Sequence, residues 1–388
     1  MNIFNFNQAC AIMDNPRHNS CHNSCHNSGK FTNNNVTSKC GHSSNLCKSF
    51  SNNVNKHNEV CKLILSQKQF EDINIKTPVT INVPVIFHIM FQTQLNINDL
   101  KNHINKNIMS VINNDFNRSK INFSNTVYSQ MIKRIFARYP NKMSLYLMQY
   151  NRLLNNNSMI KWNFYLQSIR LSLNNIISIT GDDYNDFKIK DQSPAINPDS
   201  TLNIWIAPTS NGILGISRFP WNDRDTFNHL KFDSTGGKYH GVLIASDVFG
   251  PNFEQNYPYS GYKTFSHEIG HYFGLLHTFD NETYKTNDIN RNNIAINYNT
   301  NSSEDTIGDL IVDTSYQFDA TTNYVSSNYA YTSEHMQNIF NNNNNYQPIF
   351  MNLMDYSYDS QLFFFTNDQQ GKMVYLIKRY FPKLIHSN

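Results

Sequence analysis

Cysteine is missing from most of this chain. All six cysteines of the 388-residue sequence fall within the first 61 residues, at Cys10, Cys21, Cys25, Cys40, Cys47 and Cys61. The rest of the chain therefore has to fold without disulfide bonds, by burying hydrophobic residues, which make up 39% of the sequence. Such a region is able to fold under reducing conditions. Disulfide pairing, metal binding and free thiols all remain open for the cysteines of the first segment.

Long apolar runs and strong charge are also absent. No run of about 18 apolar residues occurs, so no membrane span is expected. Residues 1–7 have neither the basic start nor the apolar stretch of a secretory signal, and the compartment is left open. Charged residues make up only 16% of the chain and the formal net charge is +3. With no Lys/Arg run either, no nucleic-acid partner is expected.

The first part of the chain, residues 1–78, is polar and lacks periodicity. It contains three copies of His-Asn-Ser between His18 and Ser28, and a cysteine follows two of them. Low complexity of this kind is typical of a disordered tail or pro-region. A metal site built from these cysteines and histidines is the alternative.

From residue 79 onward the pattern predicts strands and helices that mix in an α+β fold. Runs rich in β-branched and aromatic residues predict strands at 81–91, 162–173, 201–208 and 241–246. For the last of these, two positions remain open: the edge of the sheet, where it would hold an extended peptide, and the core. Amphipathic periodicity predicts a helix that Asn98 caps and that ends near Phe116, and another at 264–273. A third begins with the capping-box pattern from Thr366 to Gln369 and continues to Pro382, and a helical insertion is predicted at 124–154.

One stretch, His267 to His277, carries a recognisable chemistry. In a helix, His267 and His271 lie one turn apart and can reach the same ion, and Glu268 lies beside them as a general base. Gly274 is suited to the left-handed turn that ends a helix and returns His277 to the metal. Three histidines leave one position open for water, which is typical of a catalytic zinc site.

The five-residue pattern from His267 to His271 alone could arise by chance on an ordinary helix. The longer spacing, which also includes Gly274 and His277, is the metzincin signature, and its companion is a turn that contains methionine. Residues 352–357 supply such a turn around Met354, and they make chance similarity the weaker explanation.

With both motifs present, the chain resembles the pappalysin-like metzincins, peptidase family M43. The matching segments lie in the family's order: PVIFHIM, INNDF, LNIWIAP, GILGISRFP, HEIGHYFGLLHTF, GDLIVDT and PIFMNLMDYS. The resemblance implies a metzincin-type zincin fold, with a mixed twisted sheet, an active-site helix over a cleft and an irregular C-terminal subdomain. The catalytic domain would span 79–388, divided into an upper subdomain at 79–277 and a lower one at 278–388.

The resemblance also assigns roles to single residues. Met354 would form a hydrophobic floor beneath the zinc, and the Tyr356 hydroxyl would help to stabilise the charge that develops during the reaction. Three residues of GDLIVDT would be candidate calcium ligands: Asp309, Asp313 and Thr314. A locally capped turn would look the same in sequence.

Two further family features match less well. Lys39-Cys40-Gly41 resembles an element in which a pro-region cysteine closes the open zinc position, although the usual arginine is missing; a solvated tail cysteine is the alternative for Cys40. Asp359 is the nearest candidate for an aspartate that selects basic substrate residues. The cysteines that secreted members carry in the lower subdomain are absent, and secretion would follow from family analogy alone.

These observations lead to one principal hypothesis, a zinc endopeptidase that acts on protein or peptide substrates, with Glu268 as general base and acid. A catalytically silent binding or structural protein of the same fold is the alternative. Glu268 favours the enzyme, because a binding module needs no base beside its metal ligands. A metal-dependent hydrolase of other substrates is a third hypothesis, which the long signature disfavours.

Overall fold

The computed structural model describes the parts of the chain that form the sheet, its helices and the metal-binding motif. The described residues are 78–91, 95–117, 159–173, 177–210, 212–223, 225, 231–250, 258–279, 309, 311, 314, 320–321 and 351–387. Several sequence predictions lie outside them, namely those on the tail at 1–77, on Cys40, on the insertion at 124–154 and on Asp313. The division into domains stays a prediction for the same reason.

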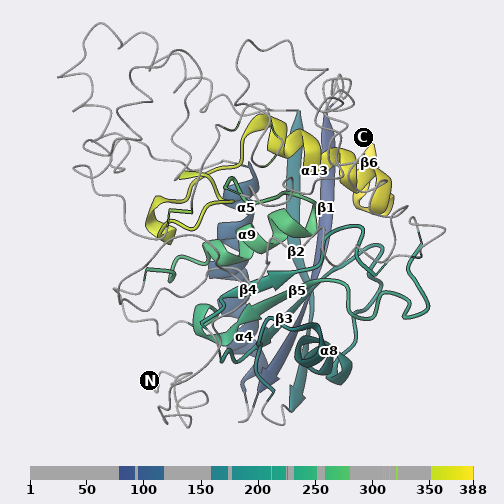
Figure 1. Cartoon of the computed structure of the whole chain (residues 1–388), viewed down its shortest axis with the longest axis vertical. Coiled ribbons are helices and arrows are strands. Elements are labelled where there is room, and N and C mark those ends of the chain that lie inside the picture. Colours follow the sequence, from purple (N-terminus) through teal and green to yellow (C-terminus); the bar gives the residue numbers. More distant parts are fainter. Residues whose placement is uncertain are drawn as a thin grey trace, which may run out of the picture.

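A mixed, six-stranded sheet forms the centre of the molecule (Figure 1). Its order is β2-β1-β3-β5-β4; β1, β2, β3 and β5 run parallel, and β4 is antiparallel to β5. A short β6 pairs antiparallel with the start of β1. The strands are β1 Val79–Phe91, β2 Ile160–Leu173, β3 Leu202–Ala207, β4 Gly215–Ser217, β5 Val242–Ala245 and β6 Ile385–Ser387.

The strand predictions agree with these bounds to within about two residues, and of the two positions open for the 241–246 strand the structure shows the core position. β5 lies inside the sheet, between β3 and β4, and the three-residue β4 is the strand at this end of the sheet. Its sequence, Gly-Ile-Ser, is too short to give a periodic signal. Pro84 lies within β1. It occupies the interval between the pairings with β6 and β3, where only β2 is bonded to β1, so its missing donor is tolerated.

The alternation along the central strands divides the core into two layers. Val83, Val85 and Phe87 of β1 face the main core, which they share with three helices: α5 (Met109–Asn117), α9 (Lys263–Tyr272) and α13 (Asn367–Tyr380). Trp205 and Leu243 face the opposite side, where Ile189 of α8 (Asp183–Gln192) covers them. Both faces are thus covered, which explains why β3 and β5 are buried along their whole length.

Further helical segments complete the main layer. α4 (Ile97–His103) continues through a π-turn, η1 (Ile104–Ile108), into α5 (Met109–Asn117). Asn96, not Asn98 as predicted, caps this helix: its side chain accepts from the backbone N–H groups of residues 98 and 99. α13 (Asn367–Tyr380) begins with the predicted capping box at Thr366 and Gln369. No described helix combines the length and apolar character that crossing a membrane requires.

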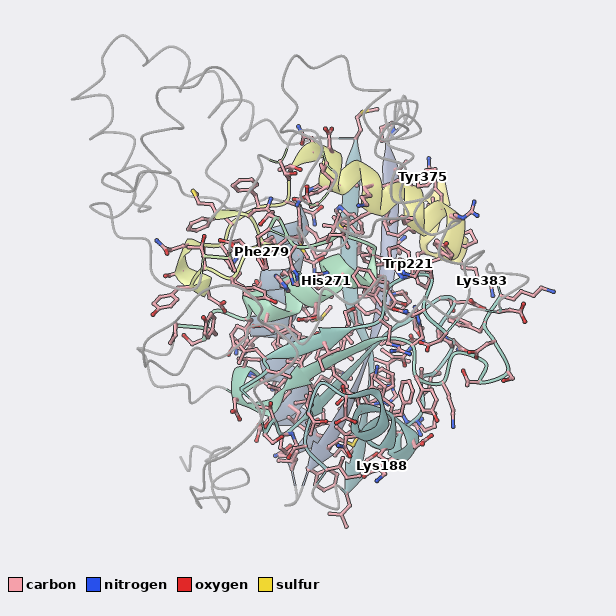
Figure 2. All side chains as sticks on the ribbon, viewed as in Figure 1. Lys188, Trp221, His271, Phe279, Tyr375 and Lys383 are labelled. Carbon is pink, nitrogen blue, oxygen red and sulfur yellow. The ribbon has the colours of Figure 1, made fainter. Side chains whose placement is uncertain are left out.

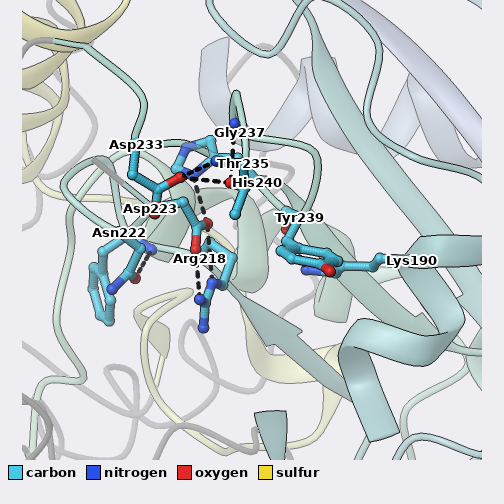
Figure 3. Close-up of polar contacts among 10 residues, drawn as sticks. Lys190, Arg218, Asn222, Asp223, Asp233, Thr235, Gly237, Tyr239 and His240 are labelled. Atoms are coloured by element: carbon cyan, nitrogen blue, oxygen red, sulfur yellow. Dashed lines mark hydrogen bonds and ion pairs between the residues drawn. The ribbon is translucent and has the colours of Figure 1, made fainter. Parts of the chain in front are cut away.

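A buried polar cluster holds the loop that follows β4 (Figure 3). Arg218 donates two hydrogen bonds to Asp223, of 3.1 and 2.6 Å, and His240 Nδ1 lies 3.3 Å from the same carboxylate. Burial by itself would raise the pKa of Asp223, but the bonds from His240 and Arg218 hold it well below its usual range. The ionised carboxylate therefore fastens the end of β4 to the segment that leads into β5.

Candidate metal centre

The helix that carries the metal motif, α9 (Lys263–Tyr272), crosses the main face of the sheet at β4 and β5 (Figure 1). It begins and ends within one residue of the prediction. Gly274 has φ +97°, its N–H bonds the His271 carbonyl, and the next N–H, of Leu275, bonds the Gly270 carbonyl. These two bonds form a Schellman motif, the helix end for which a glycine at this position is suited. The turn then returns the chain toward the helix at His277.

The three histidines meet in the interior of the molecule, where Figure 2 shows His271. His271 Nε2 lies 3.2 Å from His267 Nε2 and 3.0 Å from His277 Nε2. All three side chains are buried. Among the described residues, this is the only group of histidine, cysteine and carboxylate side chains arranged to hold a metal ion.

The hydrogen bonds of two of these rings determine which nitrogen faces inward as a ligand. His267 Nδ1 lies 2.7 Å from the Leu353 carbonyl, and His271 Nδ1 lies 2.7 Å from that of Leu275. A carbonyl only accepts, so each Nδ1 carries the proton and each Nε2 presents a lone pair. Two lone pairs 3.2 Å apart repel each other unless a cation lies between them. Neutral imidazole nitrogens are the ligands that zinc takes at about 2.0–2.1 Å, so this donor set fits zinc.

Burial keeps His271 in its metal-binding form. It lowers the pKa of His271 to about 4, against the opposing effect of the bond with Leu275. The ring is therefore neutral near pH 7, as metal coordination requires.

The predicted methionine turn lies directly against the metal-binding helix. Leu353 supplies the carbonyl that orients His267, and the Met354 carbonyl accepts from Thr278 N at 3.4 Å, just after the third histidine. The Met354 sulfur packs on α9 so closely that a Cβ added to Gly270 would lie 2.6 Å from it. Met354 is fully buried, in agreement with a hydrophobic role beneath the histidines.

Two aromatic side chains flank His277. The Tyr356 hydroxyl lies 3.3 Å from His277 Nε2, so the structure brings this predicted residue to the three histidines. The ring of Phe279 stacks on that of His277, with centroids 4.8 Å apart and an interplanar angle of 7°. Sequence reasoning missed this role of Phe279, although its i+2 spacing from the third histidine was visible.

Asp359, the candidate for selecting basic substrate residues, contacts the start of α9. The first residue before α9, Tyr262, provides no side-chain cap. Asp359 Oδ2 accepts instead from the N–H groups of Gly261 and Lys263, both at 3.0 Å, and the residue is only 4% exposed. A carboxylate at a helix N-terminus is stabilising. Its position gives no support to the selection of basic substrate residues.

The described members of the candidate calcium set are occupied by protein contacts. Asp309 Oδ1 accepts from Ile311 N and the Thr314 hydroxyl, and its Oδ2 lies 3.4 Å from Gln369 Nε2. Burial raises the pKa of Asp309 to about 6, although these bonds and the charge of Lys372 oppose the rise. These bonds form a locally capped turn, which the sequence left open as the alternative to a calcium site. They give no support to calcium binding.

Comparisons with known proteins find similarity to metallopeptidases. A family model described as metallo-peptidase family M12B, reprolysin-like, matches residues 142–278 and so ends directly after the third histidine. An extracellular metalloprotease of Arthroderma gypseum is 29% identical over 175 residues, which are 45% of this chain and 46% of that protein. An uncharacterised protein of Acanthamoeba polyphaga mimivirus is 24% identical over 366 residues, 90% of this chain and 37% of that protein. The chain thus spans less than half the length of both relatives.

The structure of a promirolysin mutant of Tannerella forsythia shares the fold. It superposes with a TM-score of 0.56 and 18% identity, and covers 89% of this chain and 96% of its own. The chain has the metzincin fold, and part of it matches a metallopeptidase family model. The expected metzincin fold is thereby confirmed, and the expected class of enzyme, a metalloendopeptidase, is supported. M12B is a different family from the pappalysin-like peptidases, so that finer assignment is not confirmed.

Proposed function

We propose that this metzincin domain is a zinc endopeptidase, with His267, His271 and His277 as the ligands. The observation that carries the proposal is the convergence of three buried ring nitrogens, two of them held as lone-pair donors by carbonyls. A bound zinc would polarise the scissile carbonyl and lower the pKa of water to about 7. The three ligands leave a position for that chemistry.

Glu268 has the role of general base and acid in this proposal. It follows the first ligand on α9, it is fully buried, and its carboxyl group lies against the backbone of Gly215 on β4. The carboxylate takes one proton from the attacking water and delivers it to the leaving nitrogen, so that the peptide bond and water become a carboxylic acid and an amine, which then exchange a proton to give a carboxylate and an ammonium group. The Tyr356 hydroxyl donates a hydrogen bond to the oxygen on which negative charge develops.

The place of β4 supports a peptide as substrate. β4 ends the sheet beside α9, and an extended peptide can add to such an edge through main-chain hydrogen bonds. We also propose that the chain is a peptidase of the pappalysin-like type. The M12B match stops at residue 278, whereas the segments around Asp309 and Met354 that carry this resemblance lie beyond it.

The test compares the wild-type chain with Glu268→Gln, which keeps the shape of the side chain but cannot accept the proton. We expect Glu268→Gln to retain one zinc per chain and to cleave a peptide library about 10²–10⁴-fold more slowly. Comparable cleavage rates in the two proteins would exclude Glu268 as the base. A zinc-loaded wild type that cleaves no peptide would favour the silent binding protein instead.

A further inference from the structure

The backbone of β4 approaches the Glu268 side chain more closely than a residue with a side chain would allow. A Cβ added to Gly215 would lie 2.6 Å from Glu268 Cγ, 2.8 Å from Oε1 and 2.9 Å from Cδ. Separations below 3.0 Å are essentially not found for real Cβ atoms. One added methyl group would therefore collide with most of the Glu268 side chain, and not with its tip alone.

Backbone conformation does not explain the glycine. Gly215 is not among the described glycines with positive φ, and it lies in a paired strand, opposite Ile244. Any L-residue adopts that conformation. What a glycine supplies at this position is space.

Neither partner in this contact can easily withdraw. On the strand side, Ala245 N bonds the Leu214 carbonyl at 2.8 Å, and Arg218 is held by Asp223. On the helix side, Ser266 donates to Asp115 of α5 at 2.6 Å, and His267 is bonded to Leu353. Close-packed interiors relax only in part around an added group. A side chain at 215 would therefore turn the Glu268 carboxyl group rather than move the strand or the helix.

We propose that Gly215 is a positioning residue for the general base: its bare backbone forms the wall that sets the direction of the Glu268 carboxyl group. The proposal rests on the proposed function for the role of Glu268, but the contact itself can be tested without catalysis. Two other glycines show that the contact is specific. A Cβ at Gly270 would meet the Met354 sulfur, and one at Gly371 of α13 would meet nothing within 4 Å.

The experiment is a double-mutant cycle in the full chain with Gly215→Ala and Glu268→Ala, read first as melting temperature. If the added methyl group meets the Glu268 side chain, Gly215→Ala lowers the melting temperature when Glu268 is present. It has little effect, or raises the temperature, when Glu268 is already alanine, because the methyl group then enters vacated space. Equal losses in both backgrounds would overturn the proposal. If Gly215→Ala alone does not fold, a folded double variant is the expected rescue, and failure of both to fold contradicts it.

The second readout separates positioning from a general structural role. We expect Gly215→Ala to keep about one zinc per chain and to lose about 10²-fold or more in kcat, with a much smaller change in KM, since the ligands are untouched and the base is misdirected. Unchanged kcat in a folded, zinc-loaded variant would overturn the proposal. Gly371→Ala is the matched control and should leave zinc and kcat unchanged. A wild type that cleaves no peptide would sink the proposed function, while the melting-temperature cycle would still decide whether residue 215 sets the Glu268 side chain.

Discussion

Two segments of very different construction meet at the three histidines. The first, residues 263–279, contains three contacts between its own residues. These are the Schellman turn at Gly274, the hydrogen bond between His271 and the Leu275 carbonyl, and the stacking of the Phe279 ring on His277. The second, residues 351–361, contributes through contacts with residues about 80 to 100 positions away, among them Leu353 to His267 and Asp359 to Gly261. The first segment thus brings the ligand atoms together, and the second orients His267 and caps the start of the helix.

The largest effect is expected when a ligand is removed from the local segment. We expect His271→Ala to lower zinc affinity by more than about 100-fold, which exceeds the effect typical of losing a partner that only orients a ligand. Zinc content after dialysis measures it. The control is His103→Ala, a part-buried histidine on α4 that bonds the Phe249 carbonyl and lies outside the three ligands. Full zinc content in His271→Ala would mean that the metal is bound elsewhere.

The long-range segment is tested at the helix N-terminus. Asp359→Ala leaves the N–H groups of Gly261 and Lys263 without their acceptor, and a buried group that loses its partner costs about 1–3 kcal/mol. We expect a loss of about 2–4 kcal/mol in the free energy of unfolding, with the cleavage-site preference unchanged. Asp191→Ala, which removes an exposed pair with Lys238, should cost less than about 1 kcal/mol. A changed preference at unchanged stability would restore Asp359 as a specificity residue.

A pH measurement tests a second contact of the long-range segment. Asp309 lies close to Gln369, and Gln369 donates a hydrogen bond to Asn352 of that segment. Burial raises the pKa of Asp309 from 3.8 to about 6. The proton is therefore bound more tightly in the folded state, and its stabilisation is fully present below about pH 4 and lost as the pH rises through about 6. Relative to Asp309→Asn, the wild type should lose up to about 3 kcal/mol of unfolding free energy between pH 4 and pH 7.

Denaturation of both proteins at several pH values, with equal zinc content, measures this difference. Asp191→Asn is a matched control with an exposed carboxylate and should show no comparable dependence. A difference that stays constant with pH, or that grows in favour of the wild type, would contradict the assigned role of Asp309. Added calcium should stabilise neither protein, since the Asp309 oxygens are occupied by protein donors.

The smallest effect is expected at the methionine turn. Met354→Leu keeps a side chain of similar volume against Gly270, so we expect a cost below about 1.5 kcal/mol and full zinc content. Met354→Ala, which leaves a cavity, should cost about 2–5 kcal/mol. Melting curves and zinc content distinguish the two. Complete loss of zinc in the leucine variant would show that the sulfur has a role beyond packing.

Several features of the fold were predictable because their cause is local. Helix α9, the Gly274 turn and the capping box at Thr366 depend on residues within one or two helical turns of each other. β1 and β3 were predictable from dense runs of β-branched residues that are buried on both faces. The start of α4 was misplaced by two residues, because Asn96 and Asn98 are equally good caps and only Asn96 lies in extended backbone at the helix start.

Other features have no local signature. The edge position of β4 depends on which neighbour pairs with β5, and three residues are too few to show a period. The capping role of Asp359 depends on a segment that approaches α9 from almost 100 residues further along the chain. The contact of Gly215 with Glu268 could not be read from the sequence either, since a glycine in a strand gives no sign of what approaches it.

By itself, the sequence determined which atoms can bind the metal, because the spacing of His267, His271 and Gly274 acts through the geometry of one helix and one turn. It also determined that most of the chain folds without disulfides. The tertiary structure decided how those atoms are used: Leu353 selects the tautomer of His267, Asp359 closes the start of α9, and the backbone of Gly215 directs Glu268. The physical reason is the distance along the chain over which each effect acts. Helical periodicity and turn preferences act over a few residues, whereas orientation within a buried site is set by close packing and by polar groups that must find partners wherever the fold brings them.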